Sequence, residues 1–148
     1  IYGSASHLGD TFYTTQLRLQ KGIISLNSAL YLYGLSDRLP DKIDFTFPRG
    51  YKNPKLRKEI VAHQQLPNLY KLGIVTIKTP QGNEVRAYSL DRTMAEILRP
   101  QYHVDPEIIN SAFKQYLNGA NKNIAKLMYF AKIFKTTKKV MNYVEVLL

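Results

Sequence analysis

Cysteine and tryptophan are both absent from this chain of 148 residues. The lack of cysteine excludes a disulfide framework, thiolate metal ligands and a cysteine nucleophile, and it suits the reducing cytoplasm, where we expect the protein to reside. Acidic residues are scarce, since 11 Asp and Glu oppose 21 Lys and Arg and give a formal net charge of +10. No apolar run approaches the roughly 18 residues of a membrane-spanning helix, so we expect no membrane partner. A positive excess of this size favours nucleic acid or another polyanion as partner.

Hydrophobic periodicity and chain length predict one domain over residues 1–148. The expected helices are 11–20, 26–33, a segment that ends at 98, 106–118, 121–134 and 137–147. The expected extended segments are 43–47, 59–63 and a hairpin over 73–88. Helices that flank a run of strands indicate an α+β fold, with a small, mostly antiparallel sheet, N-terminal helices and a C-terminal helical bundle.

Polar capping and turn residues mark the boundaries of these elements. Side chains that can cap a helix N-terminus precede four of the expected helices, at Asp10, Ser25, Ser89 or Asp91, and Asp105. The hairpin turn, Thr79–Asn83, has proline early and glycine late. That order predicts a type I turn closed by a glycine bulge.

A loop rich in cations follows the first predicted strand. Ile43, Phe45 and Phe47 alternate along that strand and predict one buried face. Five of the ten residues from 49 to 58 are Lys or Arg and none is acidic. We predict that this anchored loop binds nucleic acid or an acidic protein surface through Arg49, Tyr51, Lys52, Lys55, Arg57 and Lys58. The alternative is a solvated loop whose charges serve solubility.

Lysines on the C-terminal helices form a second candidate basic surface. Between residues 99 and 148 there are eight cations and three acids. Lys138 and Lys139 open a helix, where the helix dipole disfavours positive charge. We predict a binding role for Lys122, Lys126, Lys135, Lys138 and Lys139. The alternative is an ordinary polar helix face.

Several short motifs, in order and with matching spacing, resemble the AbiEi family of antitoxins from abortive-infection toxin–antitoxin systems. The motifs are Lys21–Ser25 with Ala29–Arg38, Thr46–Tyr51, Leu72–Ile74, Lys78–Asn83 and Tyr88–Thr93. The resemblance implies the C-terminal domain of a phage-defence antitoxin and transcriptional regulator, without the family's N-terminal winged helix-turn-helix. It also implies that Ile1–Tyr2 is the last strand of that missing domain.

The resemblance further implies the partners. Such a domain neutralises a nucleotidyltransferase-like toxin, either by direct contact or functionally. It assists DNA binding in autoregulation, while sequence specificity comes from the N-terminal domain. The resemblance implies no catalysis and no cofactor.

An enzymatic alternative is a nuclease of the restriction-endonuclease type. Asp44 on the first strand would join Glu84 and Arg86 on the hairpin, which share a face by the two-residue period. A cross-strand ion pair is the other interpretation of these charges.

Other site chemistry has little support in the sequence. The three histidines are scattered without metal-ligand spacing, and no motif surrounds the serines beside the first of them, so we predict neither a metal site nor a Ser-His-Asp triad. Five of the 11 tyrosines could stack on bases: Tyr31, Tyr33, Tyr51, Tyr70 and Tyr88. Core packing is the expected role of these rings, with Tyr51 as the exception because it lies among cations.

Overall fold

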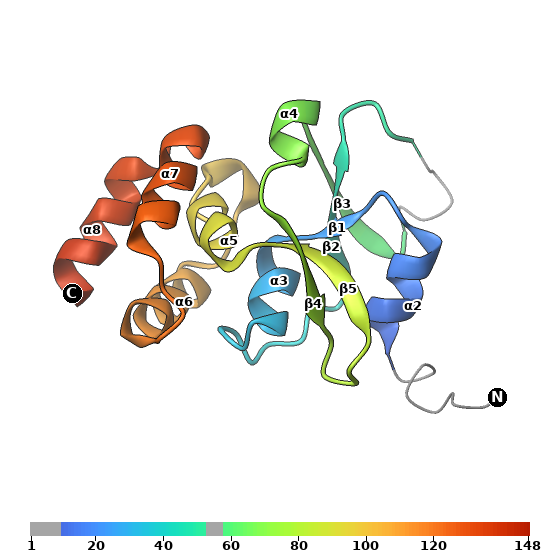
Figure 1. Ribbon diagram of the computed structural model, residues 1–148, viewed down its shortest axis with the longest axis horizontal. Helices are drawn as coiled ribbons and strands as arrows, with labels where there is room; N and C mark the ends of the chain where they lie inside the picture. Colours follow the sequence, from blue (N-terminus) through green and yellow to red (C-terminus); the bar gives the residue numbers. More distant parts are fainter. Residues whose placement is uncertain (1–9, 53–57) are drawn as a thin grey trace.

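The computed structural model describes residues 10–52 and 58–148 (Figure 1). Its strands form one five-stranded sheet in the order β3-β2-β1-β5-β4. The strands are β1 (Ile23–Ile24), β2 (Ile43–Pro48), β3 (Ile60–Gln65), β4 (Ile74–Lys78) and β5 (Glu84–Tyr88). Strand β1 pairs antiparallel with β2 and parallel with β5, β2 pairs parallel with β3, and β4 pairs antiparallel with β5.

The sheet is therefore mixed, and the prediction of a mostly antiparallel sheet is wrong. Alternation of apolar residues shows which side of a strand is buried, but it is the same for parallel and antiparallel neighbours. The short central strand β1 was not predicted, because two isoleucines are too few to display any period. The coarser prediction of a mixed helix and sheet protein is confirmed.

The described part of the chain also contains seven α-helices and one 3₁₀ turn. They are α2 (Thr11–Arg18), α3 (Leu26–Leu32), α4 (Pro67–Tyr70), α5 (Leu90–Glu96), η2 (Pro100–Tyr102), α6 (Pro106–Asn118), α7 (Ile124–Phe134) and α8 (Thr137–Leu147). Helices α5 to α8 gather at one end of the long axis, and the sheet with α2 lies at the other (Figure 1). No helix in residues 10–52 and 58–148 is long and apolar enough to span a membrane.

The predicted caps form at three of the four helices. Asp10, Ser89 and Asp105 accept hydrogen bonds from backbone N–H groups in the first turns of α2, α5 and α6. Ser25 precedes α3 but makes no capping bond. Its Oγ instead accepts from the Thr46 hydroxyl at 2.9 Å, which joins the α3 start to strand β2.

The β4–β5 hairpin has the predicted turn and is tied to the first helix. The Gly82 N–H donates to the Thr79 carbonyl at 2.8 Å, and Gly82 has φ +90, which glycine adopts without strain. Asp10 is fully buried, and its carboxylate also accepts from the Thr79 hydroxyl and, at 2.8 Å, from Asn83 Nδ2. One carboxylate therefore caps α2 and holds the turn.

Two apolar cores share helix α3. Leu26 and Leu30 pack into the core of the C-terminal helices, whereas Ala29 packs into the core beneath the sheet. Gly22 precedes β1 where the backbone lies close to the sheet core, because a Cβ there would stand 2.7 Å from the Phe45 ring. This glycine belongs to the first of the AbiEi-like motifs, and its role is packing.

The buried side chain of Arg92 connects the C-terminal helices with the sheet. Arg92 is fully buried, and its Nε lies 3.2 Å from Glu96 Oε1 on the next turn of α5. The guanidinium also donates to the carbonyls of Leu69 and Leu72 around α4, and it lies 3.5 Å over the Tyr88 ring of strand β5. Arg92 thus links the C-terminal helices, α4 and the sheet.

Candidate functional site

The basic loop between β2 and β3 is fixed where it leaves the sheet. Arg49 donates its N–H to the Gln65 carbonyl at 2.8 Å, and the Tyr51 ring stacks on Phe47 with 4.5 Å between centroids. Arg49, Lys52 and Lys58 are exposed. Lys55 and Arg57, which belong to the same predicted set, lie outside the described residues. The structure therefore anchors one end of this set and presents three of its cations to solvent.

The lysines of the second set are exposed and have no acidic partners. Residues 120–148 contain six lysines and a single acid, Glu145. The ion pairs of the described residues involve none of these lysines. Lys139 and Lys122 each donate only to a backbone carbonyl, of Leu98 and Gly119 respectively. The exposed members that were predicted as a site are Lys122, Lys126, Lys135, Lys138 and Lys139.

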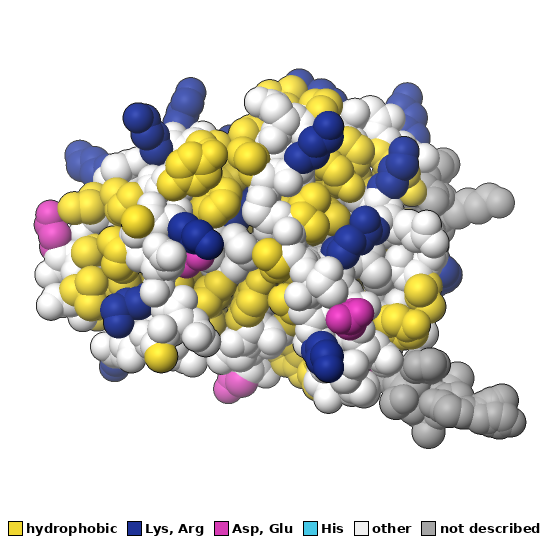
Figure 2. Space-filling view, in the orientation of Figure 1, with side chains coloured by type: hydrophobic (Ala, Val, Ile, Leu, Met, Phe, Trp, Pro, Cys, Tyr) yellow, Lys and Arg dark blue, Asp and Glu magenta, His cyan; other side chains and the backbone are white. Residues whose placement is uncertain are grey.

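The two basic sets do not form one compact patch. The β2–β3 connection and helices α7 and α8 lie toward opposite ends of the long axis (Figure 1). Figure 2 shows Lys and Arg side chains along the upper edge of the molecule, over α7, α4 and the β2–β3 side, and the acidic side chains visible on that face lie away from this edge. Further Lys and Arg side chains lie across the middle and lower part of this face, so the positive charge is not confined to the upper edge (Figure 2).

Most of the considered tyrosines belong to the core. Tyr33 donates its hydroxyl to the Tyr88 carbonyl at 2.8 Å, and Tyr88 donates to the Tyr70 carbonyl at 2.8 Å. Burial, with a smaller effect of the negative charge of Asp91, raises the pKa of Tyr33 to about 12. Burial also raises the pKa of Tyr88. Tyr31 stacks on the buried Phe12 with 5.9 Å between ring centroids.

The residues of the nuclease alternative do not come together. Asp44 lies on β2 and Glu84 on β5, and strand β1 separates the two. Glu84 stands opposite Lys78 of β4 in the strand register. Asp44 instead faces His63 of the adjacent strand β3, with its Oδ1 3.0 Å from the ring Nε2.

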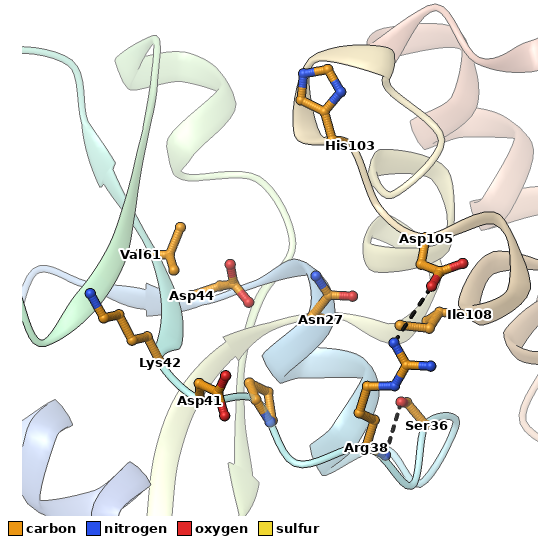
Figure 3. Close-up of a pocket in the computed structure, with 11 residues that line it drawn as sticks. Asn27, Ser36, Arg38, Asp41, Lys42, Asp44, Val61, His103, Asp105 and Ile108 are labelled. Atoms are coloured by element: carbon orange, nitrogen blue, oxygen red, sulfur yellow. Dashed lines mark hydrogen bonds and ion pairs between the residues drawn. The ribbon is translucent and has the colours of Figure 1, made fainter.

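Asp44 lines a polar pocket that sequence reasoning did not identify (Figure 3). The pocket has a volume of about 490 Å³. It is lined by Asn27, Ser36, Arg38, Pro40, Asp41, Lys42, Asp44, Val61, His103, Asp105 and Ile108. Arg38 and Asp105 pair across it at 3.5 Å (Figure 3). Its charged groups are of both signs, so the pocket adds no basic surface.

The polar side chains behind this pocket do not form a Ser-His-Asp triad. The Ser28 hydroxyl donates to Asp44 Oδ2 at 3.1 Å and accepts from the Asp44 N–H at 2.8 Å. Asp44 thus stands between Ser28 and His63, whereas nucleophilic catalysis requires the histidine to contact the serine. Within residues 10–52 and 58–148, no three His, Asp or Glu side chains are placed to hold a metal ion. His7, with its neighbouring serines, lies outside these residues.

Sequence reasoning also missed Tyr129 on α7. This side chain is 56% exposed, whereas the other tyrosines in residues 10–52 and 58–148 are buried or partly buried. A signal was available, because the helical spacing of Ile124, Leu127, Met128 and Ala131 gives this helix an apolar stripe. Tyr129 lies off that stripe and beside lysines.

No family model matches this chain, and no curated protein matches it in sequence.

Proposed function

We propose that the chain is a non-catalytic antitoxin domain of the AbiEi type, which neutralises a nucleotidyltransferase-like toxin of a phage-defence toxin–antitoxin system. The single observation that carries the proposal is the lysine surface of α7 and α8, where exposed cations have no acidic partners among the described residues. Uncompensated surface charge attracts and orients an oppositely charged partner.

The positions of the AbiEi-like motifs support this proposal indirectly. Gly22 meets the Phe45 ring, Thr79 and Asn83 bind Asp10, and Arg92 joins three parts of the molecule. These motif residues therefore stabilise the scaffold. If the scaffold is common to AbiEi antitoxins, the exposed residues determine which partner is bound. On α7 and α8 of this chain, those exposed residues are rich in lysine.

The same charge supports an auxiliary role in binding duplex DNA near a promoter. Neutralising about five phosphates would give a slope of log K against log salt near −4.5. Retardation of duplex DNA at low salt, lost as salt rises with that slope, is the expected result. Absence of retardation at low salt would remove this part of the proposal.

Co-expression tests the antitoxin function. Residues 1–148 are expressed together with the nucleotidyltransferase encoded beside them, and growth is compared with that of cells expressing the toxin alone. Restored growth is expected. Continued toxicity, with the antitoxin chain folded and present at a level equal to the toxin, would overturn the proposal. Asp44→Ala, which tests the nuclease alternative, should leave rescue unchanged where the variant folds.

A further inference from the structure

The exposed face of α7 carries one aromatic ring between two lysines. Tyr129 is 56% exposed, and Lys126 and Lys132, three residues before and after it, are exposed as well. At 3.6 residues per turn, each lysine is rotated about 60° from the ring around the helix axis, and the stripe extends along about 9 Å of that axis. Ring and cations therefore occupy one side of the helix.

The Tyr129 ring is open to solvent on this side. It touches the Phe130 ring edge-on, with 5.2 Å between centroids and 75° between planes. Its hydroxyl makes no hydrogen bond within the described residues, unlike those of Tyr33 and Tyr88. An aromatic side chain that is not part of the core and does not hydrogen-bond to a buried polar group is available to a ligand.

Composition decides between the classes of macromolecule that this stripe could bind. Tyrosine is enriched at protein–protein interfaces, so the ring by itself does not decide the class of partner. Lysines that follow a phosphate backbone, combined with an aromatic ring on which a base stacks, are typical of sites for single-stranded nucleic acid. A duplex does not offer the faces of its bases, since they are stacked on one another, whereas unpaired bases stack readily on tyrosine. The stripe thus fits an unpaired strand best.

The end of the helix adds a cation in an unfavourable backbone conformation. Lys135 has φ +60, in the left-handed region, and the N–H of the next residue, Thr136, donates back to the Ala131 carbonyl at 2.8 Å. Glycine is the usual residue at this position after a helix because it has no Cβ. A lysine here lowers stability and places another charge beside Lys132, as a binding surface would require.

We propose that Lys126, Tyr129 and Lys132 bind single-stranded nucleic acid, with an unpaired base stacked on Tyr129 and neighbouring phosphates held by the two lysines, and that Lys135 adds charge at the end of the helix. The site goes beyond toxin neutralisation: it shares Lys126 and Lys135 with the lysine surface proposed for the toxin, whereas Tyr129 and Lys132 are not members of that set.

Fluorescence anisotropy tests the proposal with a labelled oligo-dT, a labelled oligo-rU and a duplex of matched length. Tyr129→Ala should weaken binding of both single strands by about 5- to 150-fold, and Tyr129→Phe should preserve it because the ring remains. Each Lys→Gln change at Lys126 or Lys132 should reduce the slope of log K against log salt by about 0.7. Lys78→Gln is the matched control, since Lys78 is an exposed lysine on β4. It removes the same charge and should change the affinities for the single strands and for the duplex by the same factor, to within twofold.

Three results would overturn the proposal. The first is that Tyr129→Ala binds both single strands as tightly as the wild type does. The second is that the wild type prefers the duplex, and the third is that it binds no single strand at low salt. The unfolding midpoint of each variant should equal that of the wild type, since these side chains are exposed, so loss of binding cannot be attributed to loss of the fold.

Toxin rescue separates this site from the antitoxin function. Tyr129→Ala that loses strand binding and still restores growth supports the proposal. Variants of the stripe that lose rescue but bind the single strands unchanged would show a protein interface and contradict it. Failure of the wild-type chain to rescue, with strand binding intact, would contradict only the antitoxin function.

Discussion

Replacing Arg92 with methionine should destabilise the protein more than any surface change described here. The side chain is fully buried and supplies the positive partner of Glu96, whose carboxylate is 2% exposed. Methionine has a similar length and no charge. The substitution therefore keeps most of the packing volume and removes the ion pair together with the donors to the Leu69 and Leu72 carbonyls.

The expected loss is about 3–5 kcal/mol, because removal of one member of a buried ion pair leaves an uncompensated buried charge. The partly buried carbonyls of Leu69 and Leu72 also lose charged donors, which adds to the cost. Domains of this size are stable by about 5–15 kcal/mol. Arg92→Met should thus leave a marginally stable protein.

Urea unfolding, followed by far-ultraviolet circular dichroism, measures this effect. Arg92→Met, Glu96→Met and the double variant form a double-mutant cycle, in which the double variant should lose less than the sum of the single changes, since no unpaired charge remains. Arg99→Met, at a partly exposed arginine that makes no ion pair in the described residues, is the control. A loss below about 1 kcal/mol for Arg92→Met would fall within the range of ordinary point changes and would refute the role assigned to the pair.

Three further outcomes follow from the structure. Asp10→Ala should lower the free energy of unfolding in urea by about 2–4 kcal/mol, since it removes the α2 cap and the acceptor for the hairpin turn. Thr14→Ala is an exposed control, and an equal loss in the two variants would be inconsistent with that role. Lys135→Gly should raise stability by about 0.5–1 kcal/mol because it relieves a positive φ, and a lower unfolding midpoint would contradict this. The pKa of Tyr33 is raised to about 12 from its ordinary value of about 10. The neutral phenol is thus favoured in the folded state. Its contribution to the free energy of unfolding is fully present below pH 10 and should be lost as pH rises towards 12. An ultraviolet titration that shows every tyrosine ionising near pH 10 in the folded protein would refute this prediction.

Local chemistry explains why parts of the fold were predictable from the sequence. Asp10 and Asp105 cap helices through bonds to residues two or three positions away, and Gly82 closes a turn through a bond to Thr79. Such interactions depend only on neighbours in the chain. Strand direction depends on how distant segments meet, and the parallel pairing of β2 with β3 therefore had no signature in the pattern.

The candidate sites also combine features that follow from neighbours in the chain with features that depend on distant segments. Lysines on α7 and α8 were predictable as a basic surface because helical spacing determines which residues are exposed. The contact between Asp44 and His63 was not, because it follows from the β2–β3 register. Arg92 was not recognised as buried, although Glu96 four residues later on the same helix was a signal of an ion pair.

We propose that the α7–α8 lysines form the surface through which the chain neutralises a toxin. Growth rescue by two charge-matched variants tests it most directly. One variant changes Lys122, Lys126, Lys135, Lys138 and Lys139 to glutamine, and the other changes Lys21, Lys42, Lys71, Lys78 and Lys114; each removes five charges and lowers the formal net charge from +10 to +5.

Both variants should fold, which unfolding midpoints would verify before the growth test. The first should fail to neutralise the toxin, and the second should neutralise it as the wild type does. Equal rescue by the two variants would show that the α7–α8 surface has no special role.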